Sequence, residues 1–206
     1  MLEASQLACE RGDVRLFSGI DFALGEGELL WVQGPNGSGK TSLLRLVAGL
    51  SRPAAGSVRW RGEDIGELRE SFTRDLLFVG HANAVKEEFS ADENLALSLE
   101  LAGRTSTAAA RAEALARIGL AKRARLPSRY LSQGQKRRVA LARLCLAADF
   151  PLWILDEPFA ALDTRALETV VSLIDDHLER GGAVILTTHQ EVTIAARTRF
   201  SIVLEG

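Results

Sequence analysis

Eight consecutive residues, Gly34 to Thr41, have the types and spacing of a loop that binds the phosphates of a nucleotide. They read GPNGSGKT and fit the pattern G-x-x-x-x-G-K-[ST]. The glycines let the backbone curl so that successive N–H groups converge on phosphate oxygens. Lys40 is expected to reach the β- and γ-phosphates, and Thr41 to offer its hydroxyl to Mg²⁺. The alternative, a glycine-rich turn without a ligand, is disfavoured because an expected strand precedes the loop and an expected helix follows it.

Two neighbouring acids, Asp156 and Glu157, follow the apolar run LWIL and therefore stand at the end of a buried strand. A buried carboxylate without a partner is costly, so a cation or a hydrogen-bond donor should meet it, and Mg²⁺ is the simplest candidate. Ligands of open α/β sheets bind at the carboxyl ends of the strands, where the phosphate loop also begins. We expect Asp156 to hold the metal and Glu157 to orient or deprotonate an attacking water. The alternative is a strand end capped by solvated acids.

His189 follows a second buried run, VILTT, and is a candidate for contact with the γ-phosphate or with the water. A histidine at the end of a strand is structural in about half of such cases, so taken alone it decides nothing. Its combination with the phosphate loop and the two acids favours a place in the same site.

A second segment, Leu131 to Leu144, reads LSQGQKRRVALARL and has the character of a loop that presents backbone amides to a phosphate and then enters a helix. It contains no lysine-threonine pair that would complete a nucleotide site. The sequence therefore predicts half of a phosphate site at this place. The cationic residues after it, Lys136 and Arg137, are interpreted as a solvated helix face.

Composition limits the other classes of function. The 206 residues suit one folded domain, and a formal net charge of −2 gives no global positive field for nucleic acid or anionic lipid. Cys9 and Cys145 form no CxxC pair, so no disulfide framework or metal cluster is predicted and a reducing, cytoplasmic setting is expected. Neither a signal peptide nor a run of about 18 apolar residues is visible, so work at a membrane would require docking to a partner.

The elements that position these residues alternate between strand and helix. Strands are expected over 16–24, 28–33 and 76–80, in the apolar stretch before Asp156, and in AVILTTHQ and SIVLEG near the end; a hairpin is expected to turn at Arg61-Gly62. Helices are expected after the phosphate loop up to Gly49, over RALETVVSLIDDHLERGG, and across the alanine- and leucine-rich stretch from Asp92 to Ala148. This order predicts an α/β fold with a mostly parallel sheet core, an antiparallel β edge and an inserted helical subdomain.

Taken together, the motifs resemble those of the nucleotide-binding subunit of ABC transporters, over almost the whole chain. Their order is the phosphate loop, Gly80-His81, the signature LSQGQ, the acidic strand end, Ala161-Leu162-Asp163, and His189. The resemblance implies an ATP hydrolase of the P-loop fold that binds ATP and Mg²⁺ and works as a homodimer. It divides the chain into a catalytic core, 1–81 and 149–206, and a helical subdomain, 82–148. The residues it implies for ATP binding are Gly34, Pro35, Asn36, Gly37, Ser38, Gly39, Lys40 and Thr41, with Thr41 and Asp156 on the metal and Glu157 and His189 in catalysis.

The resemblance also implies what completes the half of a phosphate site predicted in the segment from Leu131 to Leu144. In that family each ATP lies between the phosphate loop of one protomer and the signature of the other. Ser132, Gln133, Gly134 and Gln135 would therefore face the ATP of the partner protomer, with Ser132 and Gly134 on its γ-phosphate. Asp163 would communicate across the dimer. Gln133 stands where the commonest signature has glycine.

Departures from the general pattern point to one subfamily, the ATPase subunits of bacterial cytochrome c maturation. His81 replaces the usual glutamine as a sensor of γ-phosphate and Mg²⁺, and the usual adenine-stacking aromatic residue is replaced near Arg11-Gly12. This resemblance implies a peripheral protein on the cytoplasmic face of the bacterial inner membrane with membrane subunits CcmB and CcmC, serving haem export or release of the haem-loaded chaperone CcmE. The three histidines are scattered, so no direct haem binding is expected, and no nucleic-acid partner is expected either.

Three alternatives remain open at this point. One is another ABC importer or exporter ATPase of the same fold. A soluble ABC-type ATPase acting on nucleic acid usually has paired domains or basic arms, which this sequence lacks. A simple P-loop kinase would leave the signature unexplained.

Overall fold

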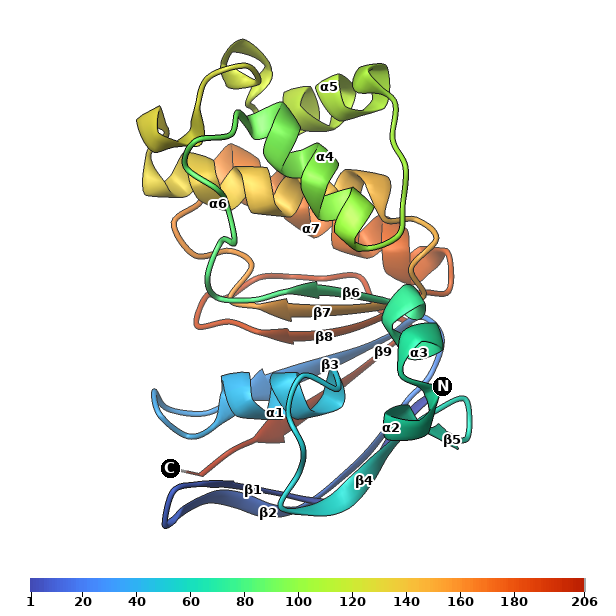
Figure 1. The fold of residues 1–206 in the computed structure, drawn as a ribbon. Helices are drawn as coiled ribbons and strands as arrows, with labels where there is room; N and C mark the ends of the chain where they lie inside the picture. Colours follow the sequence, from blue (N-terminus) through green and yellow to red (C-terminus); the bar gives the residue numbers. More distant parts are fainter. Residues whose placement is uncertain (206) are drawn as a thin grey trace.

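The computed structural model describes residues 1–205 and stacks two sheets and two groups of helices in layers. From bottom to top, Figure 1 shows an antiparallel sheet, the helix α1 (Lys40–Val47), a parallel sheet, and a lobe of helices above it. The mostly parallel core and the antiparallel part predicted from the sequence are thus confirmed, and the antiparallel strands form a sheet of their own.

The parallel sheet has the strand order β6-β7-β8-β3-β9, and every neighbouring pair in it is parallel. Its members are β3 (Glu28–Gln33), β6 (Leu76–Val79), β7 (Leu152–Asp156), β8 (Ala183–Thr187) and β9 (Thr198–Val203). All five residues of β7 and of β8 are buried, which explains their continuous apolar runs, since both faces of the sheet are covered. The predicted strands of this sheet are present, but β8 ends at Thr187, three residues before the end of AVILTTHQ, and β9 begins three residues earlier than SIVLEG suggested.

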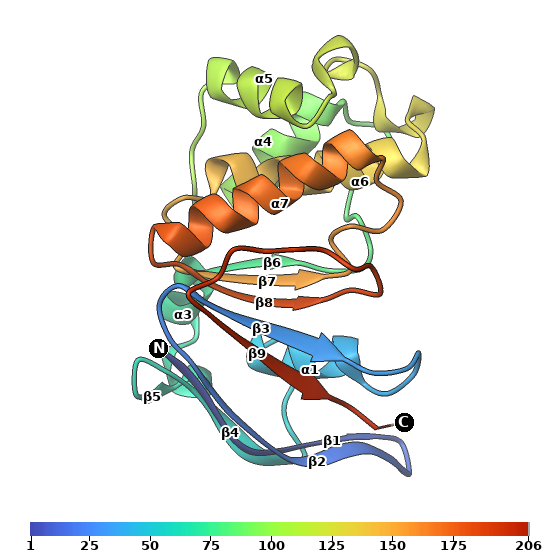
Figure 2. The same ribbon diagram turned by 180° about the vertical axis from the view of Figure 1, so that it is seen from behind.

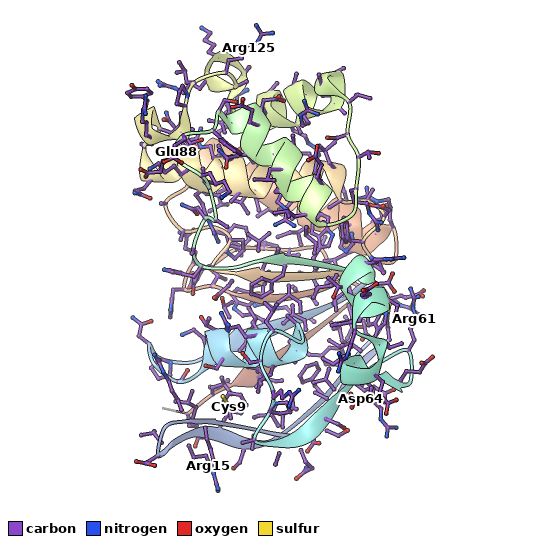
Figure 3. All side chains as sticks on the ribbon, viewed as in Figure 1. Cys9, Arg15, Arg61, Asp64, Glu88 and Arg125 are labelled. Carbon is purple, nitrogen blue, oxygen red and sulfur yellow. The ribbon has the colours of Figure 1, made fainter. Side chains whose placement is uncertain are left out.

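The antiparallel sheet has the order β2-β1-β4-β5. It consists of β1 (Leu2–Arg11), β2 (Val14–Leu24), β4 (Ala55–Trp60) and β5 (Glu63–Asp64), and β4 and β5 form the expected hairpin about Arg61-Gly62. In Figure 3, Cys9 lies on the side of this sheet that faces α1, and Arg15 lies on the opposite side. The strand β1 was not predicted, and it contributes Leu2 and Leu7 to the core.

Helix α1 fills the space between the two sheets with Leu43, Leu44, Leu46 and Val47. It ends as predicted at Gly49, whose φ of +69° is left-handed. The Leu50 N–H donates to the Arg45 carbonyl at 2.9 Å, the bond that closes a helix C-terminus of this kind. Two short helices before β6, α2 (Ile65–Leu68) and α3 (Glu70–Asp75), were not predicted.

The other face of the parallel sheet is covered by α7 (Thr164–Glu179) and by the lobe between β6 and β7, as Figure 2 shows from behind. The lobe contains α4 (Ala91–Leu101), α5 (Ala108–Arg117) and α6 (Gln133–Leu141), with 3₁₀ turns η1 (Ala121–Arg123), η2 (Ser128–Tyr130) and η3 (Ala142–Leu146). One continuous core joins it to the sheet through fully buried residues such as Phe150, Trp153 and Phe159. Trp31 and Trp153 are core residues.

No helix within residues 1–205 combines the length and the apolar character needed to cross a membrane.

Candidate functional site

Four segments that the sequence singled out meet at one edge of the parallel sheet. The phosphate loop follows β3, Gly80-His81 follows β6, Asp156-Glu157 closes β7, and His189 lies two residues beyond the end of β8. Because these strands are parallel, their carboxyl ends share one edge. A cavity of about 720 Å³ opens there, and its lining includes Lys40, Thr41, His81, Asp156, Glu157 and His189. Arg11, near the expected place of the adenine-stacking residue, lines the same cavity.

The phosphate loop owes its shape to glycines at positions that exclude a side chain. Gly34 has a φ of +142°, and a Cβ on it would lie 2.5 Å from the Leu204 carbonyl oxygen and 2.6 Å from Ser38 Oγ. Gly39 has a φ of +97° and is the N-cap of α1. Among residues 1–205, no side chain caps that helix, so its first N–H groups are free for a ligand. Lys40 Nζ donates to the carbonyls of Gly34 at 2.7 Å and Pro35 at 2.9 Å, which holds the ammonium over the loop.

The Asp156 carboxylate and the Thr41 hydroxyl are in contact, as expected of two residues that would hold one metal ion. Thr41 Oγ1 donates to Asp156 Oδ2 at 2.8 Å, and Thr187 Oγ1 donates to Oδ1 of the same carboxylate at 2.7 Å. Asp156 is only 2% exposed, so its charge is removed from water. No group of three or more histidine, cysteine or acidic side chains in the described chain could hold a metal ion. The oxygens of Thr41 and Asp156 fit Mg²⁺, which commonly uses one or two protein oxygens together with phosphates and water.

A hydrogen bond fixes the backbone of Glu157, and one oxygen of its carboxylate has no hydrogen-bond partner among the described residues. Its φ of +50° is left-handed, and its N–H donates to Thr187 Oγ1 at 2.9 Å. Within the described residues, Oε1 of Glu157 is buried without a hydrogen-bond partner, and His189 Nε2 lies 3.5 Å from it. The Glu157 side chain is 16% exposed and that of His189 54%. An unpaired carboxylate oxygen at the edge of a solvent-accessible cavity can accept a proton from a bound water.

His81 lies at the junction of two cavities. It is exposed, lines the cavity at the phosphate loop, and also lines a neighbouring cavity of about 330 Å³ between the sheet edge and the helical lobe. The second cavity is bordered by Phe78, Val85 and Asn94.

The signature segment lies outside the cavity that contains the phosphate loop. Among the described residues that line this cavity, none comes from 131–135. Ser132 caps α6: its Oγ accepts from the Gln135 N–H at 3.3 Å, and Gln135 Oε1 accepts from the Ser132 N–H at 3.0 Å. Ser132 and Gln133 are exposed. A Cβ on Gly134 would lie 2.6 Å from the Ala161 carbonyl oxygen, so this glycine permits close packing of α6 on the loop before α7.

Asp163 begins α7 in the same neighbourhood. Its Oδ1 accepts from the Ala166 N–H at 2.9 Å, and Arg138 Nη2 lies 2.6 Å from its Oδ2. The hydrogen bond from Ala166, followed by the charge of Arg138, lowers the pKa of Asp163 from its ordinary value. Asp163 is therefore an anion that joins α6 to the start of α7.

The interpretation of Lys136 and Arg137 as a solvated face is wrong. Arg137 is 3% exposed, and its guanidinium reaches the backbone at the edge of the sheet that carries Asp156 and Glu157. Nη2 donates to the carbonyls of Asp156 and Glu157, both at 2.7 Å, and Nη1 donates to the Gly80 carbonyl at 2.8 Å. Burial lowers the pKa of Arg137, and the charges of Asp156 and Glu157 oppose that shift. Lys136 is largely covered as well and pairs with Glu87 at 2.5 Å.

Thr187 and Arg137 are the two site residues that the sequence interpretation did not assign. A signal for Arg137 existed, because it shares a helical row with Leu141 and Leu144, four and seven residues on, which are buried. Thr187 stands directly after the apolar run of β8 and gave no such signal.

Comparison of the sequence with known proteins shows which family the chain belongs to. Residues 17–160 match the family model described as ABC transporter. The chain is 52% identical over 198 residues to the cytochrome c biogenesis ATP-binding export protein CcmA of Dechloromonas aromatica, covering 96% of this chain and 97% of that protein. It is 47% identical over 195 residues to CcmA of Escherichia coli K12, covering 95% of this chain and 92% of that one.

Solved structures show the same fold. A dimeric ATP-binding cassette in a post-hydrolysis state, bound to ADP and Pi, aligns with a TM-score of 0.80 and 26% identity, over 92% of this chain and 88% of that one. An ATP-binding subunit of an ABC transporter aligns with the same TM-score and 25% identity, over 91% and 79%.

Proposed function

The chain belongs to the ABC transporter family, and on that premise we propose that it is the ATP-hydrolysing subunit of a membrane complex in cytochrome c biogenesis. The observation that carries the ATPase part is the cavity where the phosphate loop, the Thr41–Asp156 pair and the unpaired Glu157 oxygen meet. The cytochrome c part is supported by relatives named CcmA that are about half identical over nearly the full length.

In the proposed reaction, each group of the chain has one task. The free N–H groups at the start of α1 and the loop bind the phosphates of ATP, and Lys40 moves from its two carbonyl partners to phosphate oxygens. Thr41 and Asp156 would hold Mg²⁺, which supplies neutralisation of phosphate charge when bound. Glu157 orients the attacking water and accepts its proton, and His189 contacts the water or the γ-phosphate.

The proposed site is completed by a second copy of the chain. Ser132 and Gly134, with Gln133 and Gln135 beside them, face the γ-phosphate of ATP held by the partner protomer, and Asp163 links the two sites. Support comes from the exposure of Ser132 and Gln133, from their absence from the cavity of their own chain within the described residues, and from the dimeric form of the similar cassette.

The proposal extends to the setting of the complex. The chain sits on the cytoplasmic face of the bacterial inner membrane with CcmB and CcmC, and its hydrolysis drives haem export or release of haem-loaded CcmE. His81 senses the γ-phosphate and transmits its presence to the membrane subunits through the adjoining cavity. We also propose a functional division into a core of 1–81 with 149–206 and a helical subdomain of 82–148.

Two measurements test this function. The purified chain should hydrolyse ATP in the presence of Mg²⁺, and the chain isolated from membranes should be recovered with CcmB and CcmC. Hydrolysis with recovery of a different permease would keep the ATPase and overturn the cytochrome c assignment. Absence of ATP binding by the folded chain would contradict both.

Changing His81 tests its sensor role separately. His81→Ala should leave ATP binding nearly intact and uncouple hydrolysis from the membrane partners. Unchanged stimulation of hydrolysis by those partners in this variant would remove the sensor role.

A further inference from the structure

We infer that Arg137 is a positioning residue for ATP hydrolysis, because its guanidinium ties α6 to the backbone that carries Glu157 and to the start of the loop that carries His81. This inference rests on the proposed function and assigns a part of it to a residue outside the nucleotide cavity. Arg137 is a positioning residue because it acts through Glu157 and Gly80 and does not line the cavity.

The contacts of Arg137 join three elements at one point. The residue belongs to α6 and follows the signature segment closely. It donates to the carbonyl of Gly80, the residue after β6, and to the carbonyls of Asp156 and Glu157 at the end of β7. The weakest of its four hydrogen bonds, 3.4 Å to Asn83 Oδ1, reaches further into the loop after His81. A guanidinium is planar and its two arms have fixed directions, so α6 cannot shift without moving these acceptors or breaking the bonds.

The burial of the Arg137 guanidinium favours a positional role over simple stabilisation. A buried cation is costly unless its N–H groups are paired, and here Nε of Arg137 has no partner among the described residues. An apolar side chain in this place would avoid that cost. What the arginine provides is donors for the backbone carbonyls of Gly80, Asp156 and Glu157.

Glu157 lies one residue beyond the ladder between β7 and β8, whose last pair is Asp156 and Thr187. The left-handed backbone of Glu157, with φ +50°, is strained for a residue with a Cβ and persists only when its surroundings hold it. Three hydrogen bonds fix this backbone. The Glu157 N–H donates to Thr187 Oγ1, and the Glu157 carbonyl accepts from Arg137 Nη2 and, at 3.2 Å, from the Ala160 N–H. Removing Arg137 therefore loosens the turn that aims the Glu157 carboxylate.

The test compares Arg137→Met and Arg137→Lys with Lys136→Met, which removes a cation from the adjacent position of the same helix. Arg137→Met should lower kcat for ATP on the order of 10–10²-fold, because displacement of a catalytic group by about 1 Å has an effect of this size. KM and the affinity for a fluorescent ATP analogue should change by less than about threefold, since the phosphate loop is untouched. Arg137→Lys should be intermediate, and Lys136→Met should hydrolyse ATP like the wild type.

Chemical rescue separates positioning from a general loss of structure. In Arg137→Ala the truncated side chain leaves space beside a cavity that Gly80, Asn83 and Asp156 line, so added guanidinium ion can enter. Millimolar guanidinium should raise kcat of Arg137→Ala and leave Lys136→Met unchanged. A melting curve for each variant shows that it is folded at the assay temperature.

The outcomes are distinguishable. If the wild type hydrolyses ATP and folded Arg137→Met or Arg137→Lys keeps the wild-type kcat, the inference is overturned. The same holds if kcat and nucleotide affinity fall together and guanidinium restores neither. If the wild type itself does not hydrolyse ATP, the proposed function fails before Arg137 is tested.

Discussion

Helices α1 and α6 both begin at a segment with the character of a phosphate site, and they begin in opposite ways. The N-cap of α1 is Gly39 in a left-handed conformation, and within residues 1–205 no side chain occupies its N-terminal N–H groups. The N-cap of α6 is Ser132, and a reciprocal pair of hydrogen bonds with Gln135 occupies two N–H groups there. The first helix is open toward a cavity of its own chain, and the second is capped and exposed.

This difference agrees with the proposed division of nucleotide binding between the two helix starts. A helix start with free N–H groups attracts an anion strongly, whereas a capped start is already satisfied and offers a hydroxyl at its tip. The start of α1 can hold a nucleotide within one chain. In the proposed dimer, the start of α6 would contact the ATP that the partner protomer holds.

The largest predicted effect concerns the chemistry beside α1. Glu157→Gln should lower kcat on the order of 10²–10⁴-fold, because the general base that accepts the proton of water is lost. ATP affinity should stay close to that of the wild type, since neither helix start is changed. Steady-state hydrolysis and nucleotide titration measure the two quantities, with Glu168→Gln in α7 as a control for removal of an acid. Hydrolysis at the original rate would show that the base lies elsewhere.

The second prediction contrasts the lysines of the two helix starts. Lys40→Met should weaken ATP binding by about 10²-fold, because charge-assisted hydrogen bonds to phosphate contribute roughly 1.5–3 kcal/mol. Lys136→Met removes the same charge from α6, where the partner is Glu87, and should leave ATP affinity of the single chain unchanged. Equal losses in the two variants would contradict the assignment of nucleotide binding to α1.

A third prediction concerns the edge of the sheet opposite the nucleotide cavity, where neither helix start contributes. His177 is 2% exposed, stacks on Trp153 with ring centroids 3.9 Å apart, and has its pKa lowered from 6.5 to about 4, chiefly by burial and then by the charge of Arg180. As the pH falls, the unfolded chain therefore binds a proton before the folded chain does. The free energy of unfolding should decrease by roughly 2–3 kcal/mol between pH 6.5 and pH 4 on this account.

Denaturant unfolding at several pH values tests this with His177→Leu, which cannot titrate at position 177. The variant should lose less stability over that pH window than the wild type, whatever its stability at pH 7. A saturating ATP analogue at neutral pH should stabilise both proteins equally, because the nucleotide cavity lies at the other edge. An identical dependence on pH in the two proteins would contradict the burial argument.

The smallest predicted effect concerns the cap of α6. Ser132→Ala should lower the free energy of unfolding by about 1 kcal/mol, whereas Ser132→Gly should cost only a few tenths. Both variants lose the hydroxyl and should bind ATP as single chains with wild-type affinity. Urea unfolding and nucleotide titration measure these effects, and a loss of single-chain ATP affinity in Ser132→Gly would show that the start of α6 belongs to the same-chain site.

The sequence was informative where the signal is local. The phosphate loop and the acids after β7 are contiguous in the chain, and the apolar runs before them fix their place at strand ends, so their convergence followed from the parallel sheet alone. The part of Ser132 in a partner's site came only from the family resemblance, since one chain's pattern contains no information on a second copy.

Two misses have physical causes. Strand β1 shows no simple alternation because its register shifts between Ala4 and Leu7, and again on both sides of Cys9, so the buried residues fall out of a period of two. Arg137 was placed in solvent because charge is usually exposed, and its burial depends on hydrogen bonds to the carbonyls of Asp156, Glu157 and Gly80. Such acceptors become visible only when β6, β7 and α6 are placed together.

The central claim is that ATP joins the open start of α1 in one chain to the capped start of α6 in another. The most direct test is the molecular mass of Glu157→Gln in solution, measured by light scattering with and without ATP. The same measurement is made on a double variant that also carries Ser132→Arg. Glu157→Gln should become a dimer with ATP, and the double variant should bind ATP with similar affinity and remain a monomer. A Glu157→Gln protein that binds ATP as a monomer, or a double variant that dimerises equally well, would contradict the account.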